Sequence, residues 1–157
     1  MPPKYSYAEI ERRWLVETID GLHLSAVRAR TIEDKYLTAG RLRLRKICEQ
    51  SCPPVFKLSK KYERIGSEPE SVVNIYLSEA EYQSLSVLPG RTATKVRYSV
   101  EGGALDVYEA PNHALVIFEM EFISCEAAAK YIAPPFVGRD VTADEKYTGF
   151  ALSEEAA

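Results

Sequence analysis

The sequence predicts an α+β, mainly β fold, and three observations support this fold class. Charged and apolar residues alternate with a period of two in five or six segments, as side chains do along β-strands. Helical segments are short and too few to cover a wide open sheet. The charged residues of each segment share one parity, and closing the sheet into a barrel with a charged, wet interior fits that pattern as well as an open sheet does.

Length and composition limit the number of domains and the classes of partner that we expect. The chain has 157 residues, which predicts a single domain over 1–157, and a formal net charge of -3, which argues against a nucleic-acid or membrane partner. Apolar runs are shorter than the roughly 20 residues of a membrane span, and the first residues do not resemble a signal peptide, so we expect a cytoplasmic protein. Cys48, Cys52 and Cys125 lack the spacing of a disulfide framework or a recognised zinc site.

The first predicted strand is the stretch Glu9–Leu15, Glu-Ile-Glu-Arg-Arg-Trp-Leu. With a period of two, Glu9, Glu11 and Arg13 share one face, while Trp14 lies on the other and is expected to pack on the barrel. Such a charged face on one strand alone would indicate only a solvated surface. Its recurrence in later strands indicates a shared environment.

The next segments continue the alternation. Residues 25–37 end in a strand, and Gly40 precedes the run Arg41-Leu42-Arg43-Leu44-Arg45, which places three guanidinium groups on one face. Three like charges in a row repel one another unless an anion lies opposite them. Residues 55–63 are the predicted hairpin partner of this strand, and residues 71–77 form another strand.

The period then changes to that of a helix. Ser78 and Glu81 form a capping box that begins a short helix ending before Pro89-Gly90. Residues 92–100, 105–109 and 115–122 follow as a β-meander, whose first turn, 101–104, uses paired glycines for positive φ angles. Ser124 caps a helix over 125–132, Thr142 begins a second capping box for a helical turn through 147, and the tail after Leu152 is expected to fray.

The charged face of the strands carries both basic and acidic residues. A row of arginine and lysine suits a polyanion with several phosphates, since guanidinium groups bind two oxygens at once. Carboxylates on the same face would repel that ligand unless divalent cations lay between them, and Mg²⁺ or Mn²⁺ would bridge carboxylate and phosphate oxygens. The residues of this face are Glu9, Glu11, Arg13, Arg41, Arg43, Arg45, Lys57 or Lys60, Lys95, Arg97, Asp106, Glu119 and Glu121.

These motifs, in this order, resemble the CYTH superfamily, the triphosphate tunnel metalloenzymes. Glu9–Arg13 is similar to the N-terminal Glu-x-Glu-x-Lys signature, and the resemblance extends to residues 141–147. It implies a closed eight-stranded antiparallel barrel with a few short flanking helices, which hydrolyses a triphosphate inside the tunnel with Mg²⁺ or Mn²⁺. A triphosphate-containing small molecule is the implied partner, and a homodimer is a further possible assembly.

The resemblance also implies roles for individual residues. The implied catalytic residues are Glu9, Glu11, Arg13, Glu119 and Glu121. The implied metal ligands are Glu9, Glu11, Asp106, Glu119 and Glu121, with Glu119 and Glu121 sharing one ion and Glu9 and Glu11 a second. The implied substrate-binding residues are Arg41, Arg43, Arg45, Lys57 or Lys60, Lys95, Arg97 and Lys146. Arg13 replaces the signature lysine, and Asn74 stands where many relatives carry an acid.

Three other interpretations remain at this point. A class IV type adenylate cyclase would use the same tunnel on ATP. A sensor that binds polyphosphate or nucleotide without turnover would fit the two departures at Arg13 and Asn74. Alternatively, the charged faces pair with one another in ordinary salt bridges and bind no ligand.

Overall fold

The computed structural model describes residues 1–155, which form one antiparallel sheet and two short α-helices. In chain order the elements are β1 (Tyr7–Glu9), β2 (Glu11–Leu15), the 3₁₀ turn η1 (Leu24–Ala26), β3 (Ala29–Leu37), β4 (Leu42–Glu49), β5 (Val55–Lys61), β6 (Glu70–Leu77), α1 (Glu79–Ser86), β7 (Gly90–Val100), β8 (Gly103–Ala110), β9 (Val116–Glu121), α2 (Cys125–Lys130), the 3₁₀ turn η2 (Glu145–Tyr147) and β10 (Glu154–Glu155).

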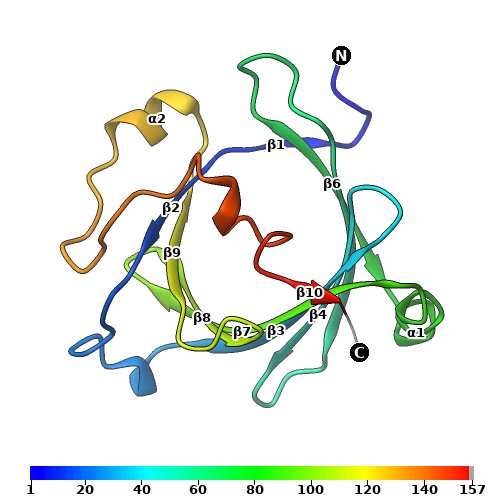
Figure 1. Ribbon diagram of the computed structural model, residues 1–157, viewed down its shortest axis with the longest axis horizontal. Coiled ribbons are helices and arrows are strands. Elements are labelled where there is room, and N and C mark those ends of the chain that lie inside the picture. The colour runs from blue at the N-terminus through cyan, green and yellow to red at the C-terminus, as the bar shows by residue number, and fades with distance from the viewer. Residues whose placement is uncertain (156–157) are drawn as a thin grey trace.

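The sheet closes through its first strand. Its order is β1-β6-β5-β4-β3-β7-β8-β9-β2, so β1 and β2 lie at opposite ends of the order although only Ile10 separates them in the chain. The Phe122 amide donates to the Ile10 carbonyl at 2.8 Å and continues the pairing past the interruption. Counted as one interrupted strand, β1 and β2 complete an eight-stranded wall in the described residues, while β10 pairs beside β7 (Figure 1). The predicted barrel is confirmed.

The main apolar core lies outside this wall. Trp14, Phe118 and Leu105 are buried together on the parity opposite to the charged residues. The segments 16–27 and 131–137 contribute the residues that cover them, and the Trp14 ring centroid lies 5.7 Å from that of Tyr131. Figure 1 shows α2 and the chain after it on the outer side of β2 and β9. Placing the core outside leaves the inner face available for charged residues, and the prediction that Trp14 packs on the barrel is confirmed.

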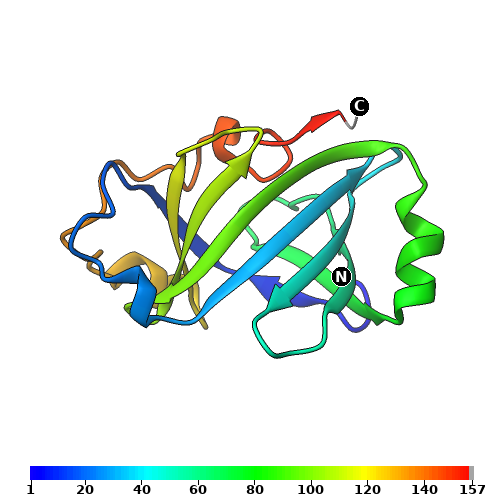
Figure 2. The same cartoon turned by 90° about the horizontal axis from the view of Figure 1, so that it is seen from below.

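The two ends of the barrel differ. The C-terminal segment, residues 145–155, packs at the end where β3 finishes and β7 begins, through Phe150 against Tyr36 and β10 against β7. Leu152 joins Tyr108 and Ile117 there in a second apolar cluster on the inner side of the wall. The β4–β5 hairpin lies at the other end (Figure 2). One end of the barrel is therefore filled by apolar side chains, and the charged residues lie in the remainder of the interior.

Local signals set the helices where the sequence predicts them. Ser78 Oγ accepts the Glu81 amide at 3.2 Å while the Glu81 side chain accepts the Ser78 amide at 2.7 Å, so the capping box of α1 is confirmed. Ser124 caps α2 in the same manner, accepting the Ala127 amide at 3.1 Å. Helix α1 packs outside the wall against β4, β5 and β6.

Three local expectations are wrong. The tight β7–β8 turn forms as predicted, but its positive φ angles belong to Glu101 and Gly102 and not to paired glycines, and Gly103 begins β8. The turn η2 is capped by Asp144, whose carboxylate accepts the Lys146 amide at 3.1 Å, and not by Thr142. Ser153 is buried and residues 154–155 pair with β7, so this part of the expected frayed tail is ordered by pairing, while residues 156–157 lie outside the described residues.

Among residues 1–155, the helices are shorter or more polar than a bilayer-crossing segment would need to be.

Candidate functional site

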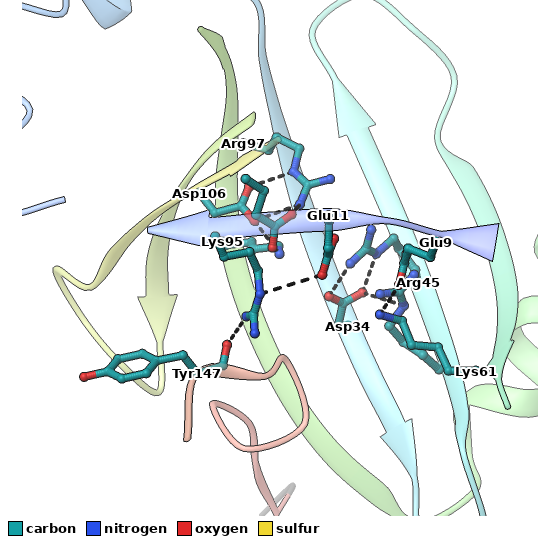
Figure 3. A network of polar contacts seen from close by, with 12 residues as sticks. Glu9, Glu11, Asp34, Arg45, Lys61, Lys95, Arg97, Asp106 and Tyr147 are labelled. Carbon is teal, nitrogen blue, oxygen red and sulfur yellow. Dashed lines mark hydrogen bonds and ion pairs between the residues drawn. The ribbon is translucent and has the colours of Figure 1, made fainter. Parts of the chain in front are cut away.

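The antiparallel register brings the charged residues to one surface. Residues directly opposite each other on neighbouring strands point to the same face of a sheet. Glu11 lies opposite Glu121 and Arg13 opposite Glu119, while Arg97 lies opposite Asp106 on the next pair of strands. Ion pairs that skip an intervening strand, between Arg97 of β7 and Glu119 of β9 and between Lys61 of β5 and Glu9 of β1, show that these side chains meet inside the barrel (Figure 3).

Three glutamates form an acidic cluster on β1, β2 and β9. One carboxylate oxygen from each of Glu9, Glu11 and Glu121 lies within 4.8 Å of the others. Burial, followed by repulsion from Glu119 and Glu9, raises the pKa of Glu11 from 4.5 to about 7. Lys61 forms an ion pair with Glu9 and partly offsets this negative charge. The cluster is thus short of positive charge at neutral pH.

Asp34 binds Arg45 with both oxygens. Arg45 Nε and Nη2 donate to the Asp34 carboxylate at 2.6 and 2.7 Å, and both side chains are almost completely buried. Although burial by itself would raise the pKa of Asp34, the Arg45 guanidinium lowers it to about 2. Arg45 is therefore neutralised by a residue that the sequence analysis did not consider.

A second buried aspartate binds two cations. Lys95 Nζ lies 2.6 Å from Asp106, and Arg97 donates to both Asp106 oxygens at 2.7 and 2.8 Å. Arg97 also donates to Glu119 at 2.8 Å. Asp106 has no exposed surface, and its pKa is held below the usual range because Lys95 and Arg97 outweigh the effect of burial.

The predicted metal ligands are therefore divided between two groups. Glu9, Glu11 and Glu121 lie together in the acidic cluster, whereas Glu119 and Asp106 accept hydrogen bonds from cations of β7. Glu9 and Glu11 lie together as expected, but Glu121 joins them, and Glu119 is bound by Arg97 instead of sharing a site with Glu121. Adjacent acids on β9 point to the same interior but reach different neighbours.

Two interior cations, Arg43 and Lys57, are not fully neutralised by neighbouring carboxylates and could bind an anion. Arg43 Nε is buried and, within residues 1–155, has no hydrogen-bond partner, and its nearest carboxylate oxygen, from Asp34, is 3.9 Å away. Lys57 lies opposite Arg45 in register, so its neighbours on that side are cationic. Burial, then the charges of Arg45 and Arg43, lowers the pKa of Lys57 to about 8. A bound anion would relieve both groups.

Arg13 connects the site to the C-terminal segment. Its guanidinium donates to the backbone carbonyl of Tyr147 and lies 3.7 Å from Glu11. Arg13 is 6% exposed, so its charge lies in the interior. The residue at the signature position thus contacts both the acidic cluster and the segment that fills one end of the barrel.

Three predicted substrate-binding residues lie away from this group. Lys60 is on the outer parity of β5 and exposed, with Nζ 4.8 Å from the Tyr62 ring, so of the two candidates it is Lys57 that faces inward. Arg41 is exposed and pairs with Glu70 at 3.1 Å. Lys146 is exposed on η2. The register explains Lys60, because a shift of one residue moves a side chain to the other face.

Sequence reasoning missed Asp34, Lys61 and Arg30. All three lie on the inward parity of strands that it identified: Arg30 and Asp34 of β3, and Lys61 of β5, four residues after Lys57. The same alternation could have found them, since 30, 32, 34 and 36 form one face. Asn74 also faces inward, where it accepts from Ser59 at 2.5 Å and donates to the Tyr7 hydroxyl at 3.1 Å.

The acidic cluster suits a hard divalent cation. It supplies only carboxylate oxygens, which Mg²⁺ and Mn²⁺ prefer, and a cation would stabilise the charged form of Glu11 that its surroundings oppose. Glu9, Glu11 and Glu121 are the residues that would hold it.

The fold and the site together define a β-barrel tunnel with an acidic cluster beside basic residues. The chain is 33% identical over 150 residues to the inorganic triphosphatase of Nitrosomonas europaea, covering 92% of this chain and 96% of that protein. A crystal structure of the inorganic triphosphatase NE1496 matches with a TM-score of 0.61 and 29% identity, covering 94% of this chain and 95% of that one.

A further crystal structure, described as the hypothetical protein NE1496, matches with a TM-score of 0.60 and 31% identity over 92% of this chain and 97% of that one. No family model matches the sequence. The chain belongs to the CYTH superfamily of triphosphate tunnel metalloenzymes, to which its inorganic triphosphatase relative assigns it.

Proposed function

We propose that this protein is a divalent-metal-dependent triphosphatase that hydrolyses inorganic triphosphate, or a similar short triphosphate, inside the barrel. The observation that carries the proposal is that an acidic cluster and incompletely neutralised cations share the inner surface of one barrel. The relative named as an inorganic triphosphatase supports the same substrate class.

The charged residues would have two roles, binding phosphate oxygens and positioning the neighbouring cations. Arg43 and Lys57 would bind phosphate oxygens, the first through a planar guanidinium and the second as a compact charge. Asp34 and Asp106 would position the cations beside them, since their carboxylates already hold Arg45, Lys95 and Arg97. Alignment and charge neutralisation are most of what phosphoryl transfer requires.

The reaction is the addition of water to a terminal phosphorus. The new bond joins the water oxygen to that phosphorus, the bridging P–O bond breaks, and the products are orthophosphate and pyrophosphate. Mg²⁺ or Mn²⁺ held by Glu9, Glu11 and Glu121 would neutralise phosphate charge and lower the pKa of water.

A product assay tests the proposal. The protein is incubated with Mg²⁺ or Mn²⁺ and inorganic triphosphate, thiamine triphosphate or ATP, and both orthophosphate and cyclic AMP are measured. We expect metal-dependent orthophosphate release from a triphosphate, and its loss in Glu11→Gln but not in Glu109→Gln, which changes an exposed glutamate on the outer parity of β8. Cyclic AMP as the product, or tight binding without turnover, would contradict a triphosphatase.

A further inference from the structure

A cavity of about 300 Å³ lies at the barrel end formed by the β4–β5 hairpin. Its lining includes Arg28 just before β3, Arg30 near the start of β3, Glu49 at the end of β4, Lys57 of β5 and Tyr76 of β6. The C-terminal segment packs at the opposite end of β3, beside Tyr36. This cavity is therefore a separate approach to the interior, away from the end that the chain itself fills.

Arg30 faces this cavity and forms no ion pair with a carboxylate of residues 1–155. In register it lies opposite Arg97 on one side and Glu49 on the other. Glu49 is already bound by Arg28, whose Nε and Nη2 donate to its two oxygens at 2.5 and 2.6 Å. Arg30 Nε is buried and, in the part of the chain that the structure describes, has no hydrogen-bond partner. The acid nearest in register is thus held by another residue.

Lys57 brings a second charge to the same cavity. Its register neighbours are Arg45 and Tyr76, and its Nζ lies 6.0 Å from the Tyr76 ring centroid. Because Arg28 and Glu49 cancel, Arg30 and Lys57 leave the lining with a surplus of positive charge. A guanidinium and an ammonium that share one cavity suit phosphoryl oxygens, which accept from both.

The cavity is also distinct from the acidic cluster. Its charged residues lie on or beside β3, β4 and β5, whereas Glu9, Glu11 and Glu121 lie on β1, β2 and β9, on the other side of the barrel in the strand order. Lys57 connects the two regions, since it is four residues before Lys61, the partner of Glu9, on the same face of β5. A chain of phosphoryl groups that begins at the acidic cluster would run past Lys57 toward Arg30.

We propose that Arg30 and Lys57 form an anion subsite in this cavity. Of the phosphoryl groups of the substrate, the subsite binds the one that lies farthest from the acidic cluster. Arg30 is thereby a residue that determines selectivity for phosphate chain length. The proposal rests on the proposed function for the orientation of the substrate, but the existence of the subsite can be measured without turnover.

Calorimetric titration in the presence of EDTA tests the subsite. Wild-type protein, Arg30→Ala and Arg30→Lys are titrated with inorganic diphosphate, triphosphate and tetraphosphate, and Arg64→Ala, in an exposed loop, is the matched control. Loss of a charge-assisted hydrogen bond should weaken triphosphate or tetraphosphate binding by roughly tenfold or more in Arg30→Ala. Diphosphate binding should change less, and Arg30→Lys should retain part of the affinity.

Glu49→Gln provides a test of opposite sign. It releases Arg28 to the cavity, so the affinity for the longer anions should rise, whereas a merely structural role of this corner would lower it. Equal affinities in Arg30→Ala and Arg64→Ala, or an equal fall for all three anions, would overturn the subsite. Binding without phosphate release under Mg²⁺ or Mn²⁺ would instead contradict the triphosphatase and leave the subsite standing.

Discussion

Two buried aspartates determine which interior cations are free for a ligand. Asp34 holds Arg45, and Asp106 holds Lys95 and Arg97, so three of the basic residues predicted to bind phosphate already have carboxylate partners. The interpretation that charged faces pair with one another is thus correct for these residues. It does not extend to Lys57, whose charged neighbours are mainly cationic, or to Arg43, whose buried Nε has no hydrogen-bond partner among residues 1–155.

Replacement of Asp34 by asparagine tests this division. Removing one partner of a buried pair leaves Arg45 charged and unpaired, so Asp34→Asn should lower the free energy of unfolding by about 3 kcal/mol. Glu33→Gln, the exposed neighbour on the outer face, is the control and should be close to neutral. Thermal unfolding with and without triphosphate provides the measurement, and the added anion should stabilise Asp34→Asn more than the wild type. An Asp34→Asn variant as stable as Glu33→Gln would contradict the role of the pair.

The pKa of Glu11 predicts how stability and metal binding depend on pH. Since this pKa is about 7 in the folded chain and near 4.5 otherwise, the metal-free protein keeps a proton that the unfolded chain loses between these values. Stability from this group is present below pH 4.5 and is lost as the pH rises through about 7. The melting temperature of wild-type protein in EDTA should therefore fall across that window relative to Glu11→Gln.

Metal binding should show the opposite trend, because a ligand carboxylate must be deprotonated. Mn²⁺ titrations at pH 5.5 and pH 8 should differ by roughly tenfold or more in Kd, with tighter binding at pH 8. Equal affinity at the two pH values would argue against Glu11 as a ligand.

Among the elements, the β8–β9 pair shows why a glycine stands at the first position of a strand. A Cβ at Gly103 would lie 2.5 Å from the Glu119 carbonyl oxygen and 2.6 Å from the Phe118 ring. Gly103→Ala should therefore cost about 1–3 kcal/mol through overpacking. Gly66 has a positive φ and open space around it, so Gly66→Ala measures the cost of backbone strain without overpacking. A Gly103→Ala variant with the unfolding free energy of the wild type would contradict the packing explanation.

The elements themselves follow from the sequence to a large extent. Alternation identifies the strands, and the Ser78–Glu81 and Ser124 signals identify both helices, because each of these patterns is local. The sequence does not distinguish Thr142 from Asp144 as the cap of η2, because both have the required oxygen and only the tertiary position of the chain selects one. The burial of Ser153 depends likewise on its contact with Arg91, more than 60 residues away in sequence.

The candidate site was less predictable than the fold. Parity predicts which side chains point inward, as for Glu9, Glu11 and Arg43, but not which neighbour each one meets. Pairing of Asp34 with Arg45 depends on register between β3 and β4, and the separation of Glu119 from Glu121 depends on the reach of Arg97 across β8. These are distances of a few ångströms in three dimensions, which a period of two cannot specify.

At the scale of the whole molecule, the barrel has its main apolar core outside and its charges inside. The segments 16–27 and 131–137 make this possible, because they cover the outer apolar parity that an exposed barrel wall would present to water. The inner surface can then remain charged without costing the fold its core. Filling of one end by Leu152, Tyr108 and Ile117 leaves the charged region to be reached from elsewhere, including the β4–β5 end.

We propose that the acidic cluster in the interior holds a divalent metal for a polyphosphate bound beside it. The most direct test of this proposal is anomalous diffraction from crystals of the protein grown with Mn²⁺ and a non-hydrolysable triphosphate analogue. We expect a manganese peak at coordination distance from Glu9, Glu11 and Glu121, next to density for the analogue along Arg43 and Lys57. Manganese bound only on the outer surface, with an interior free of both ion and analogue, would contradict the account.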